Sequence, residues 1–380
     1  MRTRVILAAI LSTGLLLPPG AAAGPALLFD AQNGRVLYAE DHDDLWHPAS
    51  LTKIMTAYLV FEALKSGRLT LETKAKYSEA AYAQPPSKVG LPVGAEMAID
   101  TALKALIIKS ANDIAVLLAE AVSGTEAQFV EKMNETATRL GMSRTRFANA
   151  SGLPAAEQVT TARDLARLSR AVVRDFPEYG HYWSMLDMRL GKARMGTHNQ
   201  LLKTFEGTDG MKTGFICDSG YNLVASATRD GVRLMAVVLG ERTGAERAIR
   251  AQSLLEHGFN THGWKALFNS PTIDNAPTSD DAKGITSVRS IVRASDCGNR
   301  VRRVVEASKK AKQQRAKTAA SAKDAKPAPS EAAATEVSAD VGNGAVTKAP
   351  EAAVPKSKPK PKATGSTAAA PASAPTPKAQ

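Results

Sequence analysis

Hydrophobic and polar residues follow different patterns in successive parts of the chain. Residues 29–38 contain two short apolar segments around an Asn-Gly turn, which is typical of a β-hairpin. Helical spacing of apolar residues dominates residues 51–173. Strand patterns return near residue 188 and after residue 211, where residues 221–228 and 232–239 flank an Arg-Asp-Gly turn. We therefore predict an α+β fold in which one antiparallel sheet packs against a helical cluster.

The first 23 residues have the pattern of an export signal. Arg2 and Arg4 precede an apolar core at residues 5–17, and three alanines at residues 21–23 form a cleavage site. We expect cleavage before Gly24. The apolar core is short for a membrane span, and an uncleaved anchor is the alternative interpretation.

Composition divides the remainder of the chain. Residues 24–263 are long enough to bury a large core as one domain with two parts. Residues 264–306 are too few for a full second domain, so we predict a short C-terminal appendage. Residues 307–380 are rich in Ala, Lys and Pro and contain almost no large apolar residues. This basic tail should be disordered, because it cannot bury enough apolar surface to offset its ordering entropy.

The tail also carries most of the net charge. It contains 13 lysines and arginines against 5 aspartates and glutamates, which is +8 of the chain's +12. A weak contact with an anionic wall polymer or membrane surface is one interpretation, and a solvated spacer is the other, which we favour. We expect no strong anchoring helix, because the tail has no apolar stripe at helical spacing. Export and the low aromatic content argue against nucleic acid as a partner.

The chain contains two cysteines, Cys217 and Cys297. Cysteines of an exported protein can pair. The sequence does not give the separation of these two, so a disulfide and two free thiols both remain open. No cluster of cysteine and histidine has the spacing of a metal site, and no cofactor is predicted.

Candidate chemistry begins with the motif Ser50-x-x-Lys53. Pro48 should end an extended segment, and Ser50 should open a helix. Residues three apart share a helix face, so the Lys53 amine can reach the Ser50 hydroxyl. A lysine with a lowered pKa can take the serine proton and make the oxygen nucleophilic. Taken alone, the motif also fits a helix-capping serine and a solvated lysine.

Two further motifs follow. Ser110-x-Asn112 lies at a break between helical runs, where a hydroxyl and a carboxamide can face a cleft; ordinary capping is the alternative. Lys212-Thr213-Gly214 opens a strand-rich region, and a strand edge suits an extended peptide substrate. Here Lys212 supplies positive charge, Thr213 a hydrogen bond to a carboxylate, and Gly214 room for the substrate backbone. An exposed strand end is the simpler alternative.

In this order, Ser-x-x-Lys, Ser-x-Asn and Lys-Thr-Gly resemble the signature of serine β-lactamases and penicillin-binding proteins. The surrounding sequences are similar to the low-molecular-weight D-alanyl-D-alanine carboxypeptidases of peptidase family S11. The similar segments are residues 48–56, 110–113, 149–154, 160–166, 209–215 and 220–227, and the resemblance extends from about residue 25 to about residue 259. It implies a β-lactamase-like fold with the site between the sheet and the helices.

The resemblance implies catalytic roles for three side chains. Ser50 is the acylated nucleophile and Lys53 is the base that activates it. Ser110 relays protons. The backbone amides of Ser50 and Phe215 form the oxyanion hole, which binds the charge that develops on the attacked carbonyl.

The resemblance also implies the substrate-binding residues. Asn112 positions the peptide, and Lys212, Thr213 and Gly214 form the recognition strand. Arg247 falls where such enzymes often place an arginine near the substrate carboxylate. A helix-surface arginine is the alternative interpretation of Arg247.

Two residues depart from the family pattern. The family often has Asn-x-Asn before the Leu201-Leu202 pair, whereas this chain has Thr197-His198-Asn199. His198 either replaces a cleft-lining group or is an ordinary loop histidine, and we favour the second interpretation. Gln158 stands where the family often has histidine.

The implied function is a periplasmic serine D-Ala-D-Ala carboxypeptidase. It would remove the terminal D-alanine from peptidoglycan stem peptides through an acyl-enzyme at Ser50, with β-lactam antibiotics as covalent inhibitors. A D,D-endopeptidase that cuts cross-links is the nearest alternative. A β-lactamase is disfavoured, because the sequence shows no convincing base for rapid deacylation. A non-catalytic wall-binding protein is the alternative of another class, and the complete motifs argue against it.

Overall fold

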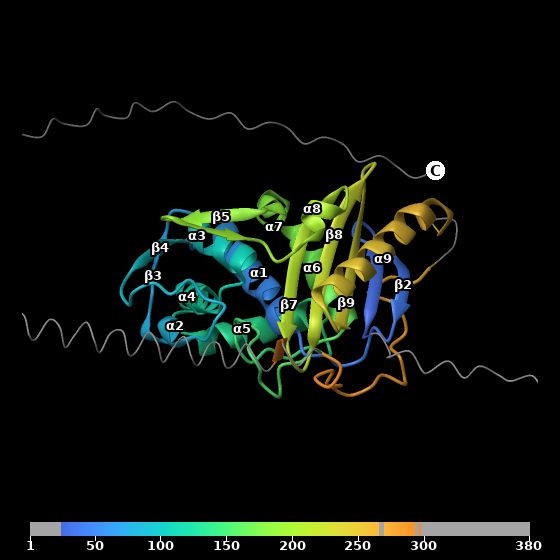
Figure 1. Cartoon of the computed structure of the whole chain (residues 1–380), viewed down its shortest axis with the longest axis horizontal. Coiled ribbons are helices and arrows are strands. Elements are labelled where there is room, and N and C mark those ends of the chain that lie inside the picture. The colour runs from blue at the N-terminus through green and yellow to red at the C-terminus, as the bar shows by residue number, and fades with distance from the viewer. Residues whose placement is uncertain (1–23, 266–269, 293–295, 298–380) are drawn as a thin grey trace, which may run out of the picture. The chain divides into compact units, whose positions relative to one another are not determined.

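The computed structural model describes residues 24–265, 270–292 and 296–297 (Figure 1). The predicted export signal at residues 1–23 and the predicted basic tail at residues 307–380 lie outside the described residues. No helix within the described part is long and apolar enough to cross a membrane.

A five-stranded antiparallel sheet forms the centre of the fold. Its strands are β1 (Ala26–Asp30), β2 (Val36–Glu40), β7 (Thr208–Ile216), β8 (Gly220–Arg229) and β9 (Val232–Glu241). Their spatial order is β2-β1-β9-β8-β7, so β1 pairs with β9 and β7 lies at one edge. Both predicted hairpins are present, with Gly34 and Gly231 at positive φ in their turns.

Helices form most of the chain between β2 and β7. They are η1 (Ala49–Leu51), α1 (Thr52–Lys65), α2 (Glu79–Ala83), α3 (Ile99–Lys104), the π-helical η2 (Ala105–Lys109), α4 (Asn112–Ser123), α5 (Glu126–Arg139), α6 (Ala162–Asp175), η3 (Pro177–Tyr179), α7 (His181–Ser184) and α8 (Leu201–Thr204). Two small hairpins, β3 (Lys74–Lys76) with β4 (Glu96–Ala98) and β5 (Asp187–Leu190) with β6 (Ala193–Gly196), lie among them. The long helix α9 (Gly244–Lys265) follows the last strand. The predicted α+β class is therefore confirmed.

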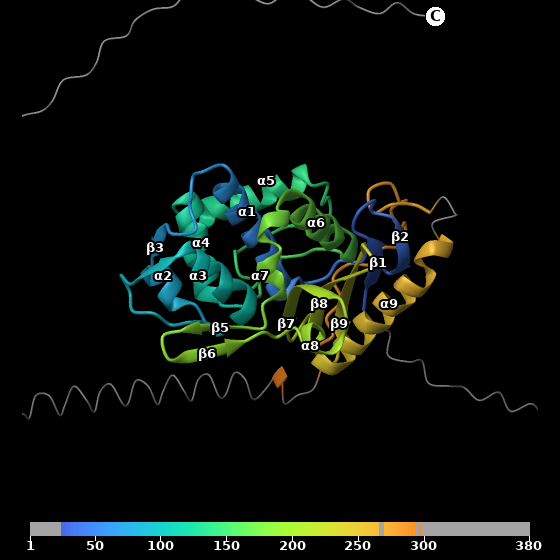
Figure 2. The same cartoon turned by 90° about the horizontal axis from the view of Figure 1, so that it is seen from above.

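The central sheet is covered on both faces (Figures 1 and 2). Successive side chains of a strand point to opposite faces. Accordingly, Leu27 and Phe29 of β1 join the core that contains the helical cluster, whereas Ala26 and Leu28 join a second core with α9. The fold is thus a sheet between a helical cluster and one long helix.

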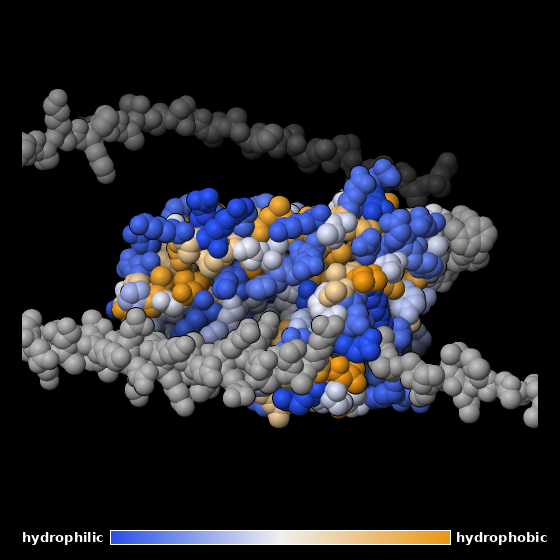
Figure 3. Space-filling view, in the orientation of Figure 1, coloured by the Kyte–Doolittle hydropathy of each residue, from blue (hydrophilic) through white to orange (hydrophobic). Residues whose placement is uncertain are grey.

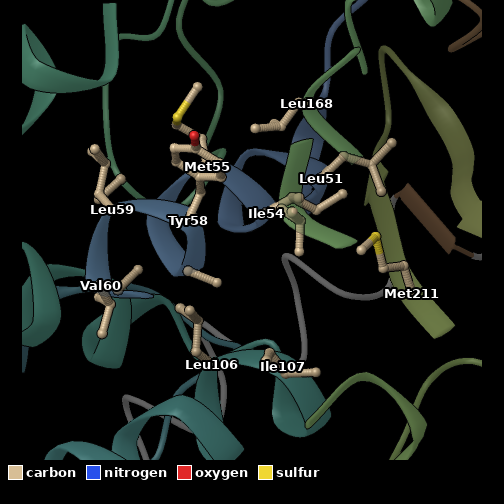
Figure 4. Close-up of a cluster of buried hydrophobic side chains, with 14 of the residues drawn as sticks. Leu51, Ile54, Met55, Tyr58, Leu59, Val60, Leu106, Ile107, Leu168 and Met211 are labelled. Carbon is tan, nitrogen blue, oxygen red and sulfur yellow. The ribbon is translucent and has the colours of Figure 1, made fainter. Parts of the chain in front are cut away.

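Helix α1 is buried on nearly all sides, with 11 of its 14 residues buried. A helix that is apolar all round belongs inside a core. Figure 4 shows Leu51 and Ile54, from the start of this helical region, near Met211 of β7. This packing fixes the residues just before α1, where the first motif lies, against the edge strand of the sheet.

The surface seen in Figure 3 carries separate apolar patches among polar residues. The large apolar side chains that are exposed among the described residues are Tyr82, Val93, Leu186, Ile249, Ile285 and Ile291. Scattered exposure of this kind is ordinary for a folded protein.

Residues 270–292 and 296–297 form a segment that we call the C-terminal strap. Ile273 of the strap is buried in the core. Arg163, a buried residue of α6, donates a hydrogen bond of 2.5 Å to the carbonyl of Ala276. The described part of the predicted appendage therefore packs directly against the sheet and the helices.

Cys217 and Cys297 form a disulfide, which settles the question that the sequence left open. Their Cα atoms lie 5.6 Å apart, although 80 residues separate them in the sequence. Cys217 lies in the turn between β7 and β8, and Cys297 belongs to the strap. The bond therefore ties the end of the chain's described part to the edge strand.

Candidate active site

Ser50 lies in the short 3-10 turn η1, directly before α1. The sequence predicted that Ser50 opens the helix, whereas α1 begins two residues later at Thr52. The turn forms because Ala49 has a φ of +48°, a left-handed conformation that is uncommon for a residue with a side chain. Ser50 lines a cleft of about 780 Å³.

Lys53 is fully buried one turn after Ser50. Its amine lies 3.1 Å from Ser50 Oγ, 2.8 Å from Asn112 Oδ1 and 2.5 Å from the carbonyl oxygen of Ser151. Burial and the nearby charge of Lys212 lower the pKa of Lys53 well below the usual lysine range. A neutral amine at hydrogen-bond distance from a serine hydroxyl can accept its proton.

Ser110 and Asn112 lie on either side of the predicted break between helices. Ser110 has left-handed angles (φ 58°, ψ 39°) and ends η2, and Asn112 begins α4. The Ser110 hydroxyl accepts a 2.9 Å hydrogen bond from the amine of Lys212. The Asn112 carboxamide accepts from Lys53 and donates to the carbonyl of Pro85 at 3.0 Å. Residues of all three motifs therefore meet at this break.

Lys212 is the second buried amine of the site and is 1% exposed. Besides Ser110 it contacts the carbonyl of Thr213 at 3.0 Å. Burial and the positive charge of Arg247 lower the pKa of Lys212 to about 7. Lys212 can therefore exchange a proton with Ser110 near neutral pH.

The Lys-Thr-Gly motif lies on β7, the edge strand beside the cleft. We expected the missing side chain of Gly214 to make room for substrate, but another part of the protein occupies that side. A Cβ at Gly214 would lie 2.9 Å from the carbonyl of Pro48 and 3.2 Å from the amide nitrogen of Ser50. Gly214 therefore lets β7 pack against η1, and this close packing brings the strand to the serine.

Arg247 is a buried residue of the cleft, so its interpretation as a helix-surface arginine is wrong. Its guanidinium lies over the ring of Tyr221 and donates to the carbonyls of Asn222 and His198 at 3.4 Å. Its Nε has no hydrogen-bond partner among the described residues. Burial lowers the pKa of Arg247 to about 10, so the group stays charged at neutral pH. None of the described residues that line the cleft is an aspartate or glutamate.

The two departures from the family pattern have different outcomes. His198 lines the cleft, so the interpretation that we favoured, an ordinary loop histidine, is wrong. Gln158 is buried, donates to the carbonyl of Leu153 at 2.9 Å and accepts from the amide of Asn149 at 3.2 Å. Gln158 therefore holds the loop that carries Ser151.

Several residues of the site had no role in the sequence-based predictions. They are the Ser151 carbonyl, which accepts from Lys53, and the cleft-lining residues Pro85, Pro86, Ser87, Lys109, Gly152, Leu153, Gln200, Ile216, Tyr221 and Gly244. The sequence around Ser151 resembled the family, but a backbone carbonyl leaves no signature in a side-chain motif. Only the fold shows that this loop reaches the catalytic amine.

A serine bonded to a buried amine, in a cleft bounded by an edge strand and a buried arginine, defines a serine acyl-transfer site on an α+β scaffold. The family model described as "D-alanyl-D-alanine carboxypeptidase" (Peptidase_S11) matches residues 16–243, more than half of the chain. The chain belongs to this family.

Individual relatives agree with this assignment. The chain is 37% identical over 248 residues to the D-alanyl-D-alanine carboxypeptidase DacC of Escherichia coli (strain K12), covering 63% of this chain and 62% of that protein. The structure is similar to that of penicillin binding protein 5 from Haemophilus influenzae, with a TM-score of 0.61, 36% identity and coverage of 64% of this chain and 73% of that chain.

A third relative is covered almost completely. Penicillin-Binding Protein D2 from Listeria monocytogenes, in its cefotaxime-bound form, has a TM-score of 0.57 and 33% identity, with coverage of 62% of this chain and 97% of that chain. By contrast, the chain matches less than two thirds of the length of the curated carboxypeptidases DacC and DacF.

Proposed function

We propose that the protein is a serine D-Ala-D-Ala carboxypeptidase, which removes the terminal D-alanine from peptidoglycan stem peptides. The observation that carries this proposal is the buried Lys53 amine, which lies 3.1 Å from Ser50 Oγ. The cleft beside Ser50 also contains the buried Arg247, and no described residue that lines the cleft is a carboxylate. Family membership and the similarity to named carboxypeptidases support it.

Acylation starts with the neutral amine of Lys53. The amine takes the proton of the Ser50 hydroxyl while Oγ attacks the carbonyl carbon of the penultimate D-alanine. The amides of Ser50 and Phe215 stabilise the oxyanion. When the C–N bond breaks, the leaving D-alanine nitrogen receives a proton from Ser110, which Lys212 recharges through their 2.9 Å hydrogen bond. An ester on Ser50 remains.

Deacylation returns the enzyme to its starting state. Before this step Lys53 loses to solvent the proton that it took from Ser50, and Lys212 regains one from solvent. A water molecule then gives one proton to the neutral Lys53 amine while its oxygen attacks the ester carbonyl. The bond to Ser50 Oγ breaks, Oγ takes that proton back from Lys53, and the shortened peptide leaves as a carboxylic acid.

The arrangement of β7 and Arg247 explains how the peptide is held. An extended peptide can add to the free edge of β7, as in other cases of β-strand addition. Thr213 and Arg247, both lining the cleft, then bind the terminal carboxylate. A buried cation with an unpartnered Nε gains most from such a ligand, because an unpaired buried donor is costly.

We also propose that β-lactam antibiotics acylate Ser50. The cefotaxime-bound and ampicillin-bound forms of the Listeria monocytogenes protein support this, at 33% identity. Localisation in the periplasm is a further proposal, supported by the export-signal pattern of residues 1–23 and by the disulfide, which suits an oxidising compartment. For the tail we keep the solvated spacer as the working hypothesis.

Mass spectrometry of the protein after two separate incubations tests the proposed function. With a penicillin, we expect a covalent adduct that maps to Ser50 and is absent from the Ser50→Ala variant. With a pentapeptide ending in D-Ala-D-Ala, we expect release of one D-alanine per peptide. An adduct without release would favour the endopeptidase, and no adduct would return weight to a non-catalytic wall-binding protein.

The role of Arg247 gives a separate prediction. Arg247→Ala should raise KM for the pentapeptide about 30-fold, equivalent to about 2 kcal/mol, while kcat changes much less, because the lost contact is to an unreacting carboxylate. Steady-state kinetics of D-alanine release measure both constants. Arg242→Ala is the matched control, since Arg242 is an exposed arginine paired with Glu246. Equal KM values in the two variants would remove Arg247 from the carboxylate site.

A further inference from the structure

Tyr221 connects the cleft to the C-terminal strap. Its ring centre lies 4.3 Å from that of Phe215, and the Arg247 guanidinium lies 5.8 Å from the ring. All three residues line the cleft. On its other side, the Tyr221 hydroxyl donates a 3.0 Å hydrogen bond to Oδ2 of Asp296 in the strap. One side chain therefore contacts both the proposed carboxylate site and the strap.

Asp296 is held in place by its neighbour Cys297. The disulfide joins Cys297 to Cys217, three residues after Gly214 of the recognition strand. A covalent bond thus keeps the Asp296 carboxylate at the end of β7 and β8, within reach of Tyr221.

A second set of contacts fixes the strap to the same turn. The guanidinium of Arg289 donates two hydrogen bonds to the carboxylate of Asp218, at 2.9 and 2.7 Å. The hydroxyl of Ser287 donates to the same carboxylate at 2.9 Å, and the amide of Val288 donates to the Asp218 carbonyl at 3.0 Å. The strap is therefore attached to the β7–β8 turn by polar contacts as well as by the disulfide.

The position of Arg247 depends on such support. The Arg247 guanidinium makes two long hydrogen bonds of 3.4 Å and lies over the face of the Tyr221 ring. A cation over an aromatic face is oriented by that face. A tyrosine whose hydroxyl is bonded to a carboxylate cannot swing freely, so the ring presents a fixed surface to Arg247.

We propose that Asp296, held by the Cys217–Cys297 disulfide, is a positioning residue for substrate binding: it fixes Tyr221, and Tyr221 holds Arg247 where the terminal carboxylate binds. This inference rests on the proposed function. The strap lies beyond residues 16–243, which match the family model, so a segment outside the matched region supports the site.

The disulfide makes this support sensitive to reduction. Dithiothreitol supplies two electrons and two protons, leaves Cys217 and Cys297 as thiols and is itself oxidised to its cyclic disulfide. Both cysteines are only partly buried. Reduction frees Asp296 from its covalent anchor, and the carboxylate site loses its support.

Kinetics of strap variants in the full chain test the proposal. Asp296→Ala and Tyr221→Phe should each raise KM for the D-Ala-D-Ala pentapeptide about 3- to 10-fold, the net contribution of one hydrogen bond, with kcat within about twofold. The double variant should be no worse than either single variant, because both remove the same bond. Asp296→Asn keeps an acceptor oxygen and should stay near wild type.

Reduction provides an independent arm of the test. Dithiothreitol should raise the KM of the wild type about 3- to 10-fold, as Asp296→Ala does. The Cys217→Ser/Cys297→Ser variant should already show this higher KM, and dithiothreitol should not raise it further. Asp274→Ala is the control for general loosening of the strap. Asp274 lies elsewhere on the strap and pairs with Arg170 of α6. Melting temperatures confirm that each variant is folded.

Three results would overturn the inference: unchanged KM in Asp296→Ala and Tyr221→Phe, an equal rise in Asp274→Ala, or an equal rise for the peptide amide, which lacks the carboxylate. If Asp296→Ala does not fold, Tyr221→Phe alone decides, because it keeps the ring and removes only the hydroxyl. Absence of D-alanine release by the wild type would overturn the proposed function and this inference with it. Normal release with unaffected variants would overturn the inference only.

Discussion

Replacing Lys53 by alanine should abolish acylation of Ser50 while the protein remains folded. The amine is the group that lies 3.1 Å from Ser50 Oγ, and its lowered pKa favours the neutral form that can act as a base. Loss of a general base typically costs between 10² and 10⁴ in rate, so we expect a fall of about 1,000-fold. Time courses of labelling by a fluorescent penicillin measure the acylation rate directly.

Lys65→Ala is the matched control for this prediction. Lys65 belongs to the same helix, but its side chain is at the protein surface and contacts the carbonyl of Asp175. Labelling of the Lys65 variant should match the wild type, and circular dichroism should show both variants folded. Unchanged labelling of Lys53→Ala would mean that another group activates Ser50.

The same base sets the direction of the pH dependence. Acylation needs the neutral amine, so the rate rises as pH increases through the pKa of Lys53. Because burial and the charge of Lys212 lower this pKa, the rise should be complete at a lower pH than an ordinary lysine would allow. The charge of Lys53 therefore follows from the fold, and the sequence motif alone could not supply it.

The residues that the sequence identified are those whose side chains carry the chemistry. Ser50, Lys53, Ser110 and Lys212 were found because their types and spacing are characteristic, and the structure brings them together through 3.1 and 2.9 Å contacts. The sheet and the helical cluster were predicted because the two periodicities of apolar residues differ. Both kinds of signal are local in the sequence.

What the sequence did not provide depends on contacts between distant segments. The Cys217–Cys297 pair and the path of the strap require knowledge of how residues 80 positions apart are placed. The environment of Gly214 was misread for the same reason, since its neighbour is the backbone of Pro48. The burial of Arg247 likewise arises from the packing of α9 beside β8, which no motif encodes.

Gly152 has left-handed backbone angles and packs against the distant turn η1. Its replacement should therefore also have a large effect on activity. Its φ is +85°, and a Cβ there would lie 1.8 Å from the carbonyl oxygen of Ala49 and 3.0 Å from the amide nitrogen of Ser50. These neighbours are backbone atoms of η1 and cannot rotate away. Gly152→Ala must therefore displace either η1, with Ser50, or the loop whose Ser151 carbonyl binds Lys53.

We expect Gly152→Ala to lower kcat/KM for D-alanine release by at least about 100-fold, because a shift of about 1 Å in a reacting group has an effect of this size. Gly67→Ala is the control: Gly67 has a φ of +71°, but a Cβ there has no neighbour within 4 Å. Both variants carry the left-handed strain of about 1–2 kcal/mol, seen as a lower melting temperature. Only Gly152→Ala should lose activity, since the contact with η1 exists only there. Equal activity in the two variants would show that Ser50 tolerates movement of its turn.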